Sequence, residues 1–338
     1  MKSLVCKQPD QFIMNETDIP SAKEGEALIR ISRIGICGTD FHAYRGRQPF
    51  FSYPRVLGHE LAGEIVTIQA NPQNLIAGDQ VTIIPYLECG KCIACRNGKP
   101  NCCTGLKVLG VHADGGMQEY MVVPITHLMK TNDITADQTA TVECFSIGAH
   151  AVKRADIQKE EFVIVIGAGP IGLGVMKFAK LAGAKVIALD MNEQRLNFCR
   201  EWAGVDYTVN VASSNAQEEM MNITNGEFAS AVFDVTGNAN SMSNAYKFAA
   251  HGGRLIYVGL VQADVSFPDP EFHKRELTLL SSRNATRDDF EYVIQSIKEG
   301  NIDTDAFITS KTPFDQITQK FETFMNPDSN TIKAMITL

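Results

Sequence analysis

The chain has 338 residues, a hydrophobic content of 44% and a formal net charge of −8. This length predicts about two domains, each with its own core, and the acidic balance without clustered Lys/Arg argues against nucleic-acid binding. The N-terminus loses its apolar character too early for a signal peptide, and the longest apolar stretch, 162–176, is too short and too often interrupted to span a bilayer. We therefore expect a cytoplasmic protein that acts on a small molecule.

Short strands separated by turns are predicted over the first part of the chain, up to about residue 142. The segments with strand-like composition are 27–32, 62–68, 80–84 and 118–123. No helical pattern long enough to connect parallel strands lies between them. The first part of the chain is therefore predicted to be β-rich.

Cys37, which follows the first of these strands, opens a segment with several reactive side chains. Thr39 and His42 follow Cys37 by two and five residues, and a hydroxyl and an imidazole there suit the transfer of a proton from a bound alcohol to water. His59 and Glu60 precede the next strand, and together with Cys37 they offer the sulfur, nitrogen and oxygen donors of a catalytic zinc site. An isolated histidine is more often an ordinary polar residue, and Glu60 has the alternative of a buried carboxylate paired with an arginine.

A second group of possible zinc ligands has the spacing C-x2-C-x2-C-x7-C and consists of Cys89, Cys92, Cys95 and Cys103. In a chain with nine cysteines and no export signal, metal binding and free thiols are favoured over disulfides. Four thiolates leave no open position, which predicts a structural zinc ion. Cys102 competes with its neighbour Cys103 as the fourth ligand, and spacing alone does not decide between them.

Strands alternate with helices from about residue 144 to residue 280, which predicts a parallel α/β unit. The strand 162–166 leads into a G-x-G-x-x-G loop and then an amphipathic helix, the arrangement that binds the pyrophosphate of a dinucleotide at a helix N-terminus. The loop residues are Gly167, Gly169, Pro170, Ile171 and Gly172.

Asp190 ends the next strand, 18 residues beyond Gly172. Its carboxylate can accept hydrogen bonds from ribose hydroxyls and would repel a 2′-phosphate, so NAD is favoured over NADP. Thr236, Val258 and Gly259 are predicted at two further strand ends on the same edge of the sheet, where they would line the nicotinamide, and Arg195 is added as a candidate cofactor contact.

The motifs occur in the order found in the zinc-dependent medium-chain alcohol and polyol dehydrogenases, which the chain resembles over essentially its whole length. The segments that carry the resemblance are 35–40, 58–60, 78–79, the four-cysteine segment and 167–172. The resemblance implies an α/β protein with a β-rich GroES-like catalytic domain and a doubly wound parallel-sheet Rossmann domain. The expected boundaries are 1–145 for the catalytic domain, with a structural-zinc lobe at 86–106 and completion by 281–338, and 146–280 for the NAD-binding domain.

The same resemblance implies a third protein ligand for the catalytic zinc, and alignment on the segment 146–148 puts Glu143 in that position. Cys144, where family members commonly have proline, offers a rival thiolate of equal charge. We favour Glu143, and we expect Glu60 to bind zinc transiently or to orient His59. The family spacing also favours Cys103 over Cys102.

Within this family the chain is more similar to sorbitol, threonine and sugar-acid dehydrogenases, and segments 48–60, 269–274 and 282–286 resemble the bacterial L-galactonate 5-dehydrogenases. We expect an enzyme that oxidises a secondary hydroxyl of a sugar acid or polyol with NAD and two zinc ions per chain. The resemblance implies a homodimer or homotetramer, joined along 254–259, although an exposed sheet edge could equally be covered within one chain. A sugar acid needs a cation for its carboxylate, with Arg45, Arg47, Lys274 and Arg283 as candidates. The alternatives are a sorbitol- or threonine-type dehydrogenase, and a non-catalytic NAD-binding protein with zinc only in the cysteine lobe.

Overall fold

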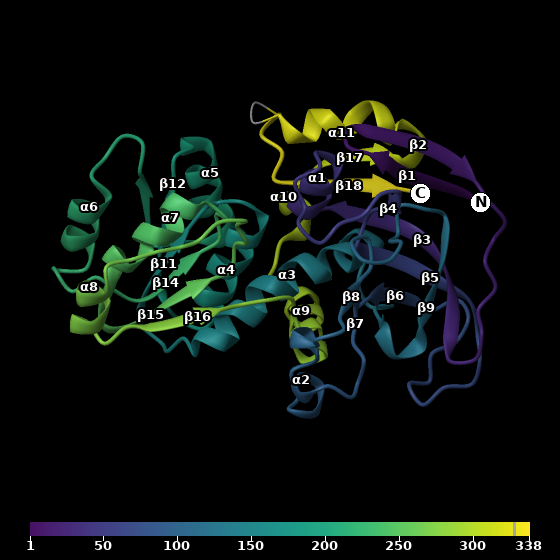
Figure 1. The fold of residues 1–338 in the computed structure, drawn as a ribbon, viewed down its shortest axis with the longest axis horizontal. Helices are drawn as coiled ribbons and strands as arrows, with labels where there is room; N and C mark the ends of the chain where they lie inside the picture. The colour runs from purple at the N-terminus through teal and green to yellow at the C-terminus, as the bar shows by residue number, and fades with distance from the viewer. Residues whose placement is uncertain (327–328) are drawn as a thin grey trace. The chain divides into compact units, whose positions relative to one another are not determined.

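The computed structural model describes residues 1–326 and 329–338, and it divides into two compact units (Figure 1). One unit consists of Met1–Cys144 and Thr286–Leu338, and the other of Phe145–Ala285. The sequence placed the second boundary at 280, whereas the residues up to Ala285 belong with the second unit. The reason is the strand β16 (Thr278–Ser281), which hydrogen-bonds to the sheet of that unit.

The first unit is built on a seven-stranded, mostly antiparallel sheet in the order β10-β6-β5-β3-β18-β17, with β9 also paired to β3. Buried side chains of these strands, such as Ile29, Ile34 and Leu61, form its core. The strands are β3 (Glu26–Ile36), β5 (Glu60–Ile68), β6 (Gln80–Ile83), β9 (Tyr120–Pro124), β10 (Leu128–Lys130), β17 (Ile308–Pro313) and β18 (Lys333–Thr337). A smaller sheet contains β1 (Lys2–Gln8), β2 (Gln11–Glu16) and β4 (Arg55–Val56).

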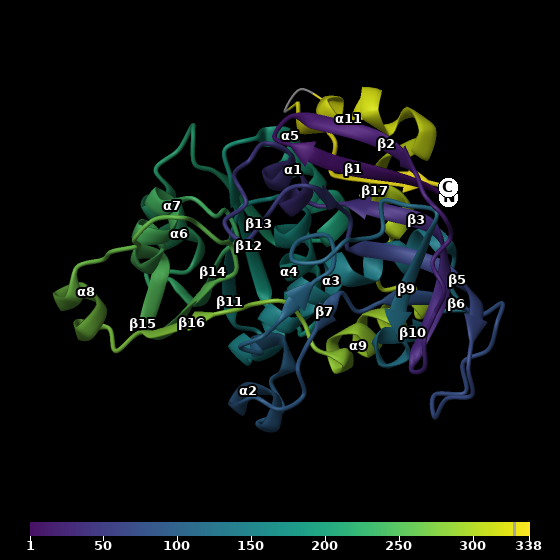
Figure 2. The ribbon, with the colours of Figure 1, turned by 45° about the vertical axis from the view of Figure 1, so that its right-hand side comes forward.

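The two ends of the chain meet in this unit. The last strand, β18, pairs antiparallel with β3 and parallel with β17, and both views show the C-terminal segment beside the N-terminal strands (Figures 1 and 2). The helices of this part are α9 (Arg287–Lys298), α10 (Thr304–Phe307) and α11 (Ile317–Met325). The C-terminal segment therefore completes the sheet that carries the candidate zinc ligands.

Short elements complete the first unit. The helix α1 (Gly38–Tyr44) follows β3, and the four-cysteine lobe contains β7 (Tyr86–Leu87), α2 (Ile93–Arg96) and β8 (Lys107–Val108). The long helix α3 (Ala136–Ala155) includes the point at which the chain passes into the second unit.

The second unit is a six-stranded parallel sheet in the order β13-β12-β11-β14-β15-β16, with helices against it (Figures 1 and 2). Central strand residues such as Ile164, Ile187 and Val232 are completely buried, as expected of parallel strands covered on both faces. The elements are β11 (Phe162–Ile166), α4 (Pro170–Leu181), β12 (Lys185–Asp190), α5 (Glu193–Phe198), β13 (Tyr207–Asn210), α6 (Ala216–Ile223), β14 (Ala229–Asp234), α7 (Ala239–Asn244), β15 (Ala249–Tyr257) and α8 (Asp269–Lys274).

The predicted fold class, a β-rich unit with a doubly wound parallel-sheet unit, is confirmed. The expected subunit contact along 254–259 stays a prediction, but the strand order places it away from the sheet edge. Strand β15 pairs with β14 on one side and with β16 on the other, so β16 and not β15 lies at the edge of the sheet. In the part of the chain that the structure describes, no helix combines the length and the apolar character needed to cross a membrane.

Candidate zinc and dinucleotide sites

Cys37, His59 and Glu60 form one of two groups of described residues whose ligand atoms lie within 4.8 Å of one another. Cys37 is the N-cap of α1, and Glu60 is the first residue of β5, directly after His59. His59 and Glu60 are buried and Cys37 is half-buried. The structure thus brings together the sulfur, nitrogen and oxygen donors that the sequence predicted, a set that fits zinc.

Asp40, which the sequence reasoning missed, holds this group together. Its Oδ2 accepts a hydrogen bond from the Cys37 amide at 2.9 Å, and its Oδ1 accepts one from the Gly58 amide at 3.1 Å. The signal was present in the sequence, because Asp40 occupies the third position after the N-cap Cys37, as in a capping box. The carboxylate therefore fixes the start of α1 to the segment that carries His59.

The ring of His59 faces the same carboxylate. Its Nδ1 lies 3.7 Å from Asp40 Oδ1 and has no hydrogen-bond partner among the described residues. Burial lowers the pKa of His59, but the charges of Asp40 and Cys37 outweigh burial and raise it well above its usual value. A carboxylate behind an imidazole is the usual environment of a metal-bound histidine.

Glu60 is paired with a lysine rather than with the arginine considered from the sequence. Both partners are almost fully buried, and Lys333 Nζ donates to Oε1 and Oε2 of Glu60 at 2.7 and 2.8 Å. Gly35, opposite Glu60 on β3, makes room for the carboxylate, since a Cβ there would lie 2.0 Å from Glu60 Oε2. Lys333 was not predicted, because nothing local marks one lysine of the last strand as a partner of a residue 273 positions away.

Glu143 is not part of the 4.8 Å group. It is buried on α3, and its Oε1 accepts a hydrogen bond from the hydroxyl of Tyr86. Burial, together with the nearby charge of Glu60, raises the pKa of Glu143 to about 7 against the opposing effect of His59. Its neighbour Cys144 is also buried, and burial raises the pKa of this thiol well above its usual value.

Thr39 and His42, the predicted proton-transfer residues, both lie on α1. They are three residues apart and therefore neighbours on one side of the helix. Thr39 is half-buried and His42 is exposed. This order leads from the Cys37 end of the helix towards solvent.

The second group of ligand atoms within 4.8 Å consists of Cys89, Cys92, Cys95 and Cys103. Cys102 does not belong to it, although it is adjacent to Cys103. Backbone amides of Cys89 and Gly105 donate to the Cys103 sulfur, both at 3.3 Å. Four convergent sulfurs with backbone donors fit a closed structural zinc site.

The predicted dinucleotide loop has the required backbone. Gly167 has φ +108°, and a Cβ on Gly172 would lie 1.9 Å from the Gly167 carbonyl oxygen, so neither position tolerates a larger residue. Gly169 is the N-cap of α4, with Pro170 and Ile171 in its first turn. The α4 N-terminus therefore presents unpaired amides at the end of β11.

The other predicted cofactor residues lie at the carboxyl ends of neighbouring parallel strands. Asp190 ends β12 and accepts a hydrogen bond from the Ala168 amide at 2.7 Å, which fixes the carboxylate beside the loop. The amides of Val258 and Gly259 donate to the Asp234 carbonyl at 2.9 and 3.1 Å. Thr236 donates to the Asp234 carboxylate at 2.6 Å, and Arg195 lies in the first turn of α5, after β12.

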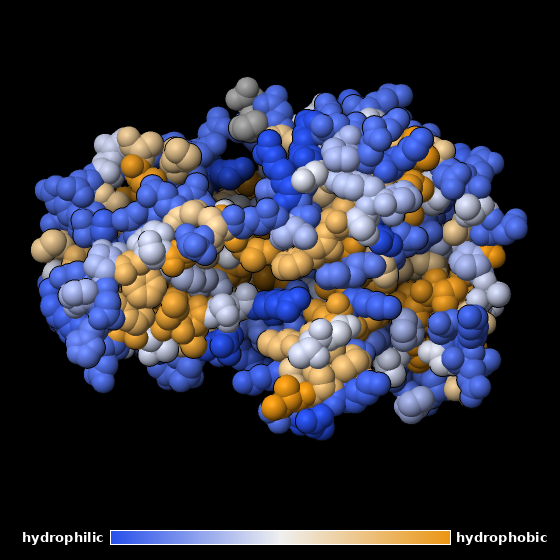
Figure 3. Space-filling view, in the orientation of Figure 1, coloured by the Kyte–Doolittle hydropathy of each residue, from blue (hydrophilic) through white to orange (hydrophobic). Residues whose placement is uncertain are grey.

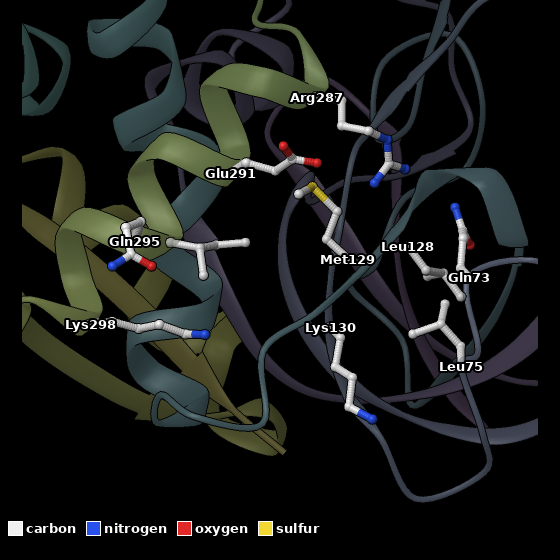
Figure 4. Close-up of a pocket in the computed structure, with 10 residues that line it drawn as sticks. Gln73, Leu75, Leu128, Met129, Lys130, Arg287, Glu291, Gln295 and Lys298 are labelled. Carbon is white, nitrogen blue, oxygen red and sulfur yellow. The ribbon is translucent and has the colours of Figure 1, made fainter.

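A shallow groove of about 350 Å³ lies between α9 and β10 in the first unit (Figure 4). Its cationic side chains already have partners. Lys130 pairs with Asp79 and Lys298 with Asp133, each at 2.6 Å, and Arg287 donates to a backbone carbonyl. None of the predicted site residues lines this groove, and we assign no function to it.

Comparison with known proteins is consistent with this geometry. Residues 23–133 match the alcohol dehydrogenase GroES-like domain and residues 170–299 the zinc-binding dehydrogenase domain. The L-galactonate-5-dehydrogenase of Escherichia coli K12 is 42% identical over 340 residues, which cover 100% of this chain and 99% of that protein. The L-idonate 5-dehydrogenase of Vitis vinifera is 31% identical, with 95% of this chain and 90% of that protein covered.

A solved structure, the alcohol dehydrogenase rspB of E. coli CFT073 in complex with NADH, superimposes with a TM-score of 0.94 at 30% sequence identity, covering 100% of this chain and 99% of that one. The sequence similarity extends over the full chain and includes both units. The chain belongs to the zinc-dependent medium-chain dehydrogenases and is an oxidoreductase of that family.

Proposed function

We propose that this chain oxidises a secondary hydroxyl of a sugar acid, with L-galactonate as the first candidate, and transfers the hydride to NAD. The observation that carries the proposal is the group of half-buried Cys37 and buried His59 and Glu60, whose donors suit a catalytic zinc. The substrate class is supported by the 42% identity to an L-galactonate-5-dehydrogenase over the full chain. An acidic residue at position 143 fits a polyol-type site, since the resemblance implies cysteine there in simple alcohol dehydrogenases.

The proposed roles of the residues are as follows. Cys37, His59 and Glu143 hold the catalytic zinc, and Glu60, neutralised by Lys333, lies beside them. Bound zinc supplies an electrophile for the substrate oxygen, and bound NAD supplies the hydride acceptor. Thr39 accepts the hydroxyl proton, and His42, three residues further along α1, passes it to solvent.

Of the four cations considered for the substrate carboxylate, Arg47 is the best supported, because the other three already interact with other groups. Arg45 is already paired with Asp10 at 2.5 Å, and Lys274 with Glu271 at 3.1 Å. The Arg47 amide donates to the His42 carbonyl at 2.8 Å, which ties this residue to the proposed proton-transfer helix. Arg47 forms no ion pair with any residue that the structure describes, so its guanidinium is available for a carboxylate.

We further propose that the enzyme is a cytoplasmic homodimer or homotetramer, joined at the edge strand β16. Leu279 on this strand is 43% exposed, and apolar side chains gather over β15 and β16 on the face in Figure 3. An open strand edge with an apolar residue is favourable for pairing with a second copy. The proposed cytoplasmic location rests on the nine cysteines, all of which are free thiols. Free thiols persist in a reducing compartment such as the cytoplasm.

The test is a substrate panel with NAD and with NADP that includes L-galactonate, sorbitol, threonine and simple alcohols. We expect turnover of L-galactonate with NAD. Arg47→Gln is expected to raise KM for the sugar acid about tenfold and to leave KM for an uncharged polyol unchanged. Preference for sorbitol or threonine would reject the sugar-acid assignment, and failure to turn over any member would favour the non-catalytic alternative.

A further inference from the structure

Tyr86, a buried residue outside the predicted site, contacts Glu143. Tyr86 is 4% exposed, and its hydroxyl donates to Oε1 of Glu143, which is also 4% exposed. The Glu143 carboxylate accepts no other side-chain or backbone hydrogen bond within residues 1–326 and 329–338. A buried carboxylate needs partners for both oxygens, so Oε2 is the oxygen left for a different ligand.

The tyrosine itself is held firmly. Its ring packs edge-on against Phe290, with 6.3 Å between centroids and an interplanar angle of 80°. Its backbone carbonyl lies 3.2 Å from Nε2 of His127, and the same nitrogen lies 3.0 Å from the carboxylate of Glu88. Ring and backbone are thus both fixed, so the hydroxyl is a rigid reference point for Glu143.

We propose that Tyr86 is a positioning residue of the catalytic zinc site, which fixes Oε1 of Glu143 so that Oε2 is presented to the metal ion. This inference rests on the proposed function, in which Glu143 is a zinc ligand. The hydroxyl restricts the carboxylate to binding through one oxygen and removes the rotational freedom that Glu143 would otherwise lose on binding metal. Carboxylate ligands held in this way bind their metal more tightly, and loss of such a partner typically weakens binding ten- to hundredfold.

The same tyrosine connects this site with the cysteine lobe. Tyr86 lies on β7, which pairs with β8 across the lobe, and it precedes Cys89 by three residues. Order in the four-cysteine lobe therefore supports the position of the hydroxyl at Glu143.

The test compares Tyr86→Phe with the wild type and with Tyr44→Phe. Tyr44 is a matched control, because it is a buried tyrosine of the same unit whose hydroxyl donates to a different glutamate, Glu322, at 3.0 Å. The dissociation constant of the second zinc equivalent is measured by competition with a chelator, and cobalt in its place is followed by visible absorption. We expect a ten- to hundredfold weaker second site and an altered cobalt spectrum in Tyr86→Phe, and no change in Tyr44→Phe.

A second pair of variants serves in case Tyr86→Phe does not fold. In Tyr86→Phe the buried carboxylate of Glu143 loses its hydrogen-bond donor. Glu143→Gln removes the charge of that carboxylate, so Glu143→Gln can be compared directly with the double variant Glu143→Gln/Tyr86→Phe. If Tyr86 acts through Glu143, the two variants bind the second zinc equally. A further tenfold loss in the double variant, or an unchanged second site in Tyr86→Phe, overturns the inference. A wild type that binds only one zinc rejects the proposed function instead.

Discussion

The buried ion pair between Lys333 and Glu60 gives the strongest stability prediction. Methionine is similar in length to lysine, so Lys333→Met removes only the charged end of the side chain. Glu60 then keeps its place but loses the ammonium group that donates to its two oxygens at 2.7 and 2.8 Å. The side chains of Lys333 and Glu60 are only 1% and 0% exposed. Removing one partner of a buried pair costs about 3–5 kcal/mol, because the remaining charge has lost its water as well as its partner. For a unit of about 200 residues this corresponds to a fall in melting temperature on the order of 6–20 °C.

The assay must report on the first unit. The single tryptophan, Trp202, lies in the second unit, so its fluorescence would follow the wrong part of the chain. Calorimetry at one fixed zinc concentration resolves both units. The double variant Lys333→Met/Glu60→Met, in which two apolar side chains replace the pair, is expected to recover most of the loss. Equal melting temperatures for Lys333→Met and Lys333→Arg would refute the reasoning.

Three further outcomes follow from the same unit. Gly35→Ala brings a Cβ to 2.0 Å from Glu60 Oε2. We expect this variant to be destabilised by several kcal/mol, about as much as by loss of the ion pair. Gly38→Ala has nothing within 4 Å of its Cβ and should unfold like the wild type in the same calorimetric scan. Metal analysis should find one zinc fewer per chain in Cys103→Ser and an unchanged content in Cys102→Ser, and equal losses would show that the two cysteines are interchangeable. Burial opposes ionisation of Asp79, but hydrogen bonds from its lysine and amide donors prevail and lower its pKa, so the ionised form stabilises the fold by about 1–2 kcal/mol above pH 4. This advantage over Asp79→Asn should disappear in urea titrations as the pH falls below 4, and a difference that persists there would exclude the charge as its source.

The sequence predicted most of the fold because its signals are local. The strand, loop and helix around Gly167 follow one another within twenty residues, and the parallel sheet then follows from the alternation of strands and helices. The edge strand β16 was not predicted, and there is a physical reason. This strand is short and mostly exposed, so it carries little periodic signal.

The candidate site was predictable only in part, for the same reason. Cys37, His59 and Glu60 belong to short motifs with recognisable donors, and the structure groups them. Tyr86 and Lys333 matter through single contacts with residues 57 and 273 positions away. A tyrosine or lysine in a strand has no local feature that identifies such a partner, so only the tertiary structure reveals it.

The first unit contains both ends of the chain, so a residue of the last strand can contact the candidate metal site near the N-terminus. Strand β18 enters beside β3, where Met335 pairs with Gly35 and Gly35 pairs with Glu60 on the other side. Gly35 leaves room on β3 for the Glu60 side chain. Lys333, two residues before Met335, donates from its ammonium group to the Glu60 carboxylate. The charge of Glu60 beside the candidate zinc ligands is thus balanced only when the C-terminal strand is in place. A chain that ends before β18 would expose the edge of β3 and leave this carboxylate unpaired, so we infer that the metal site forms only after the C-terminal segment has joined the sheet.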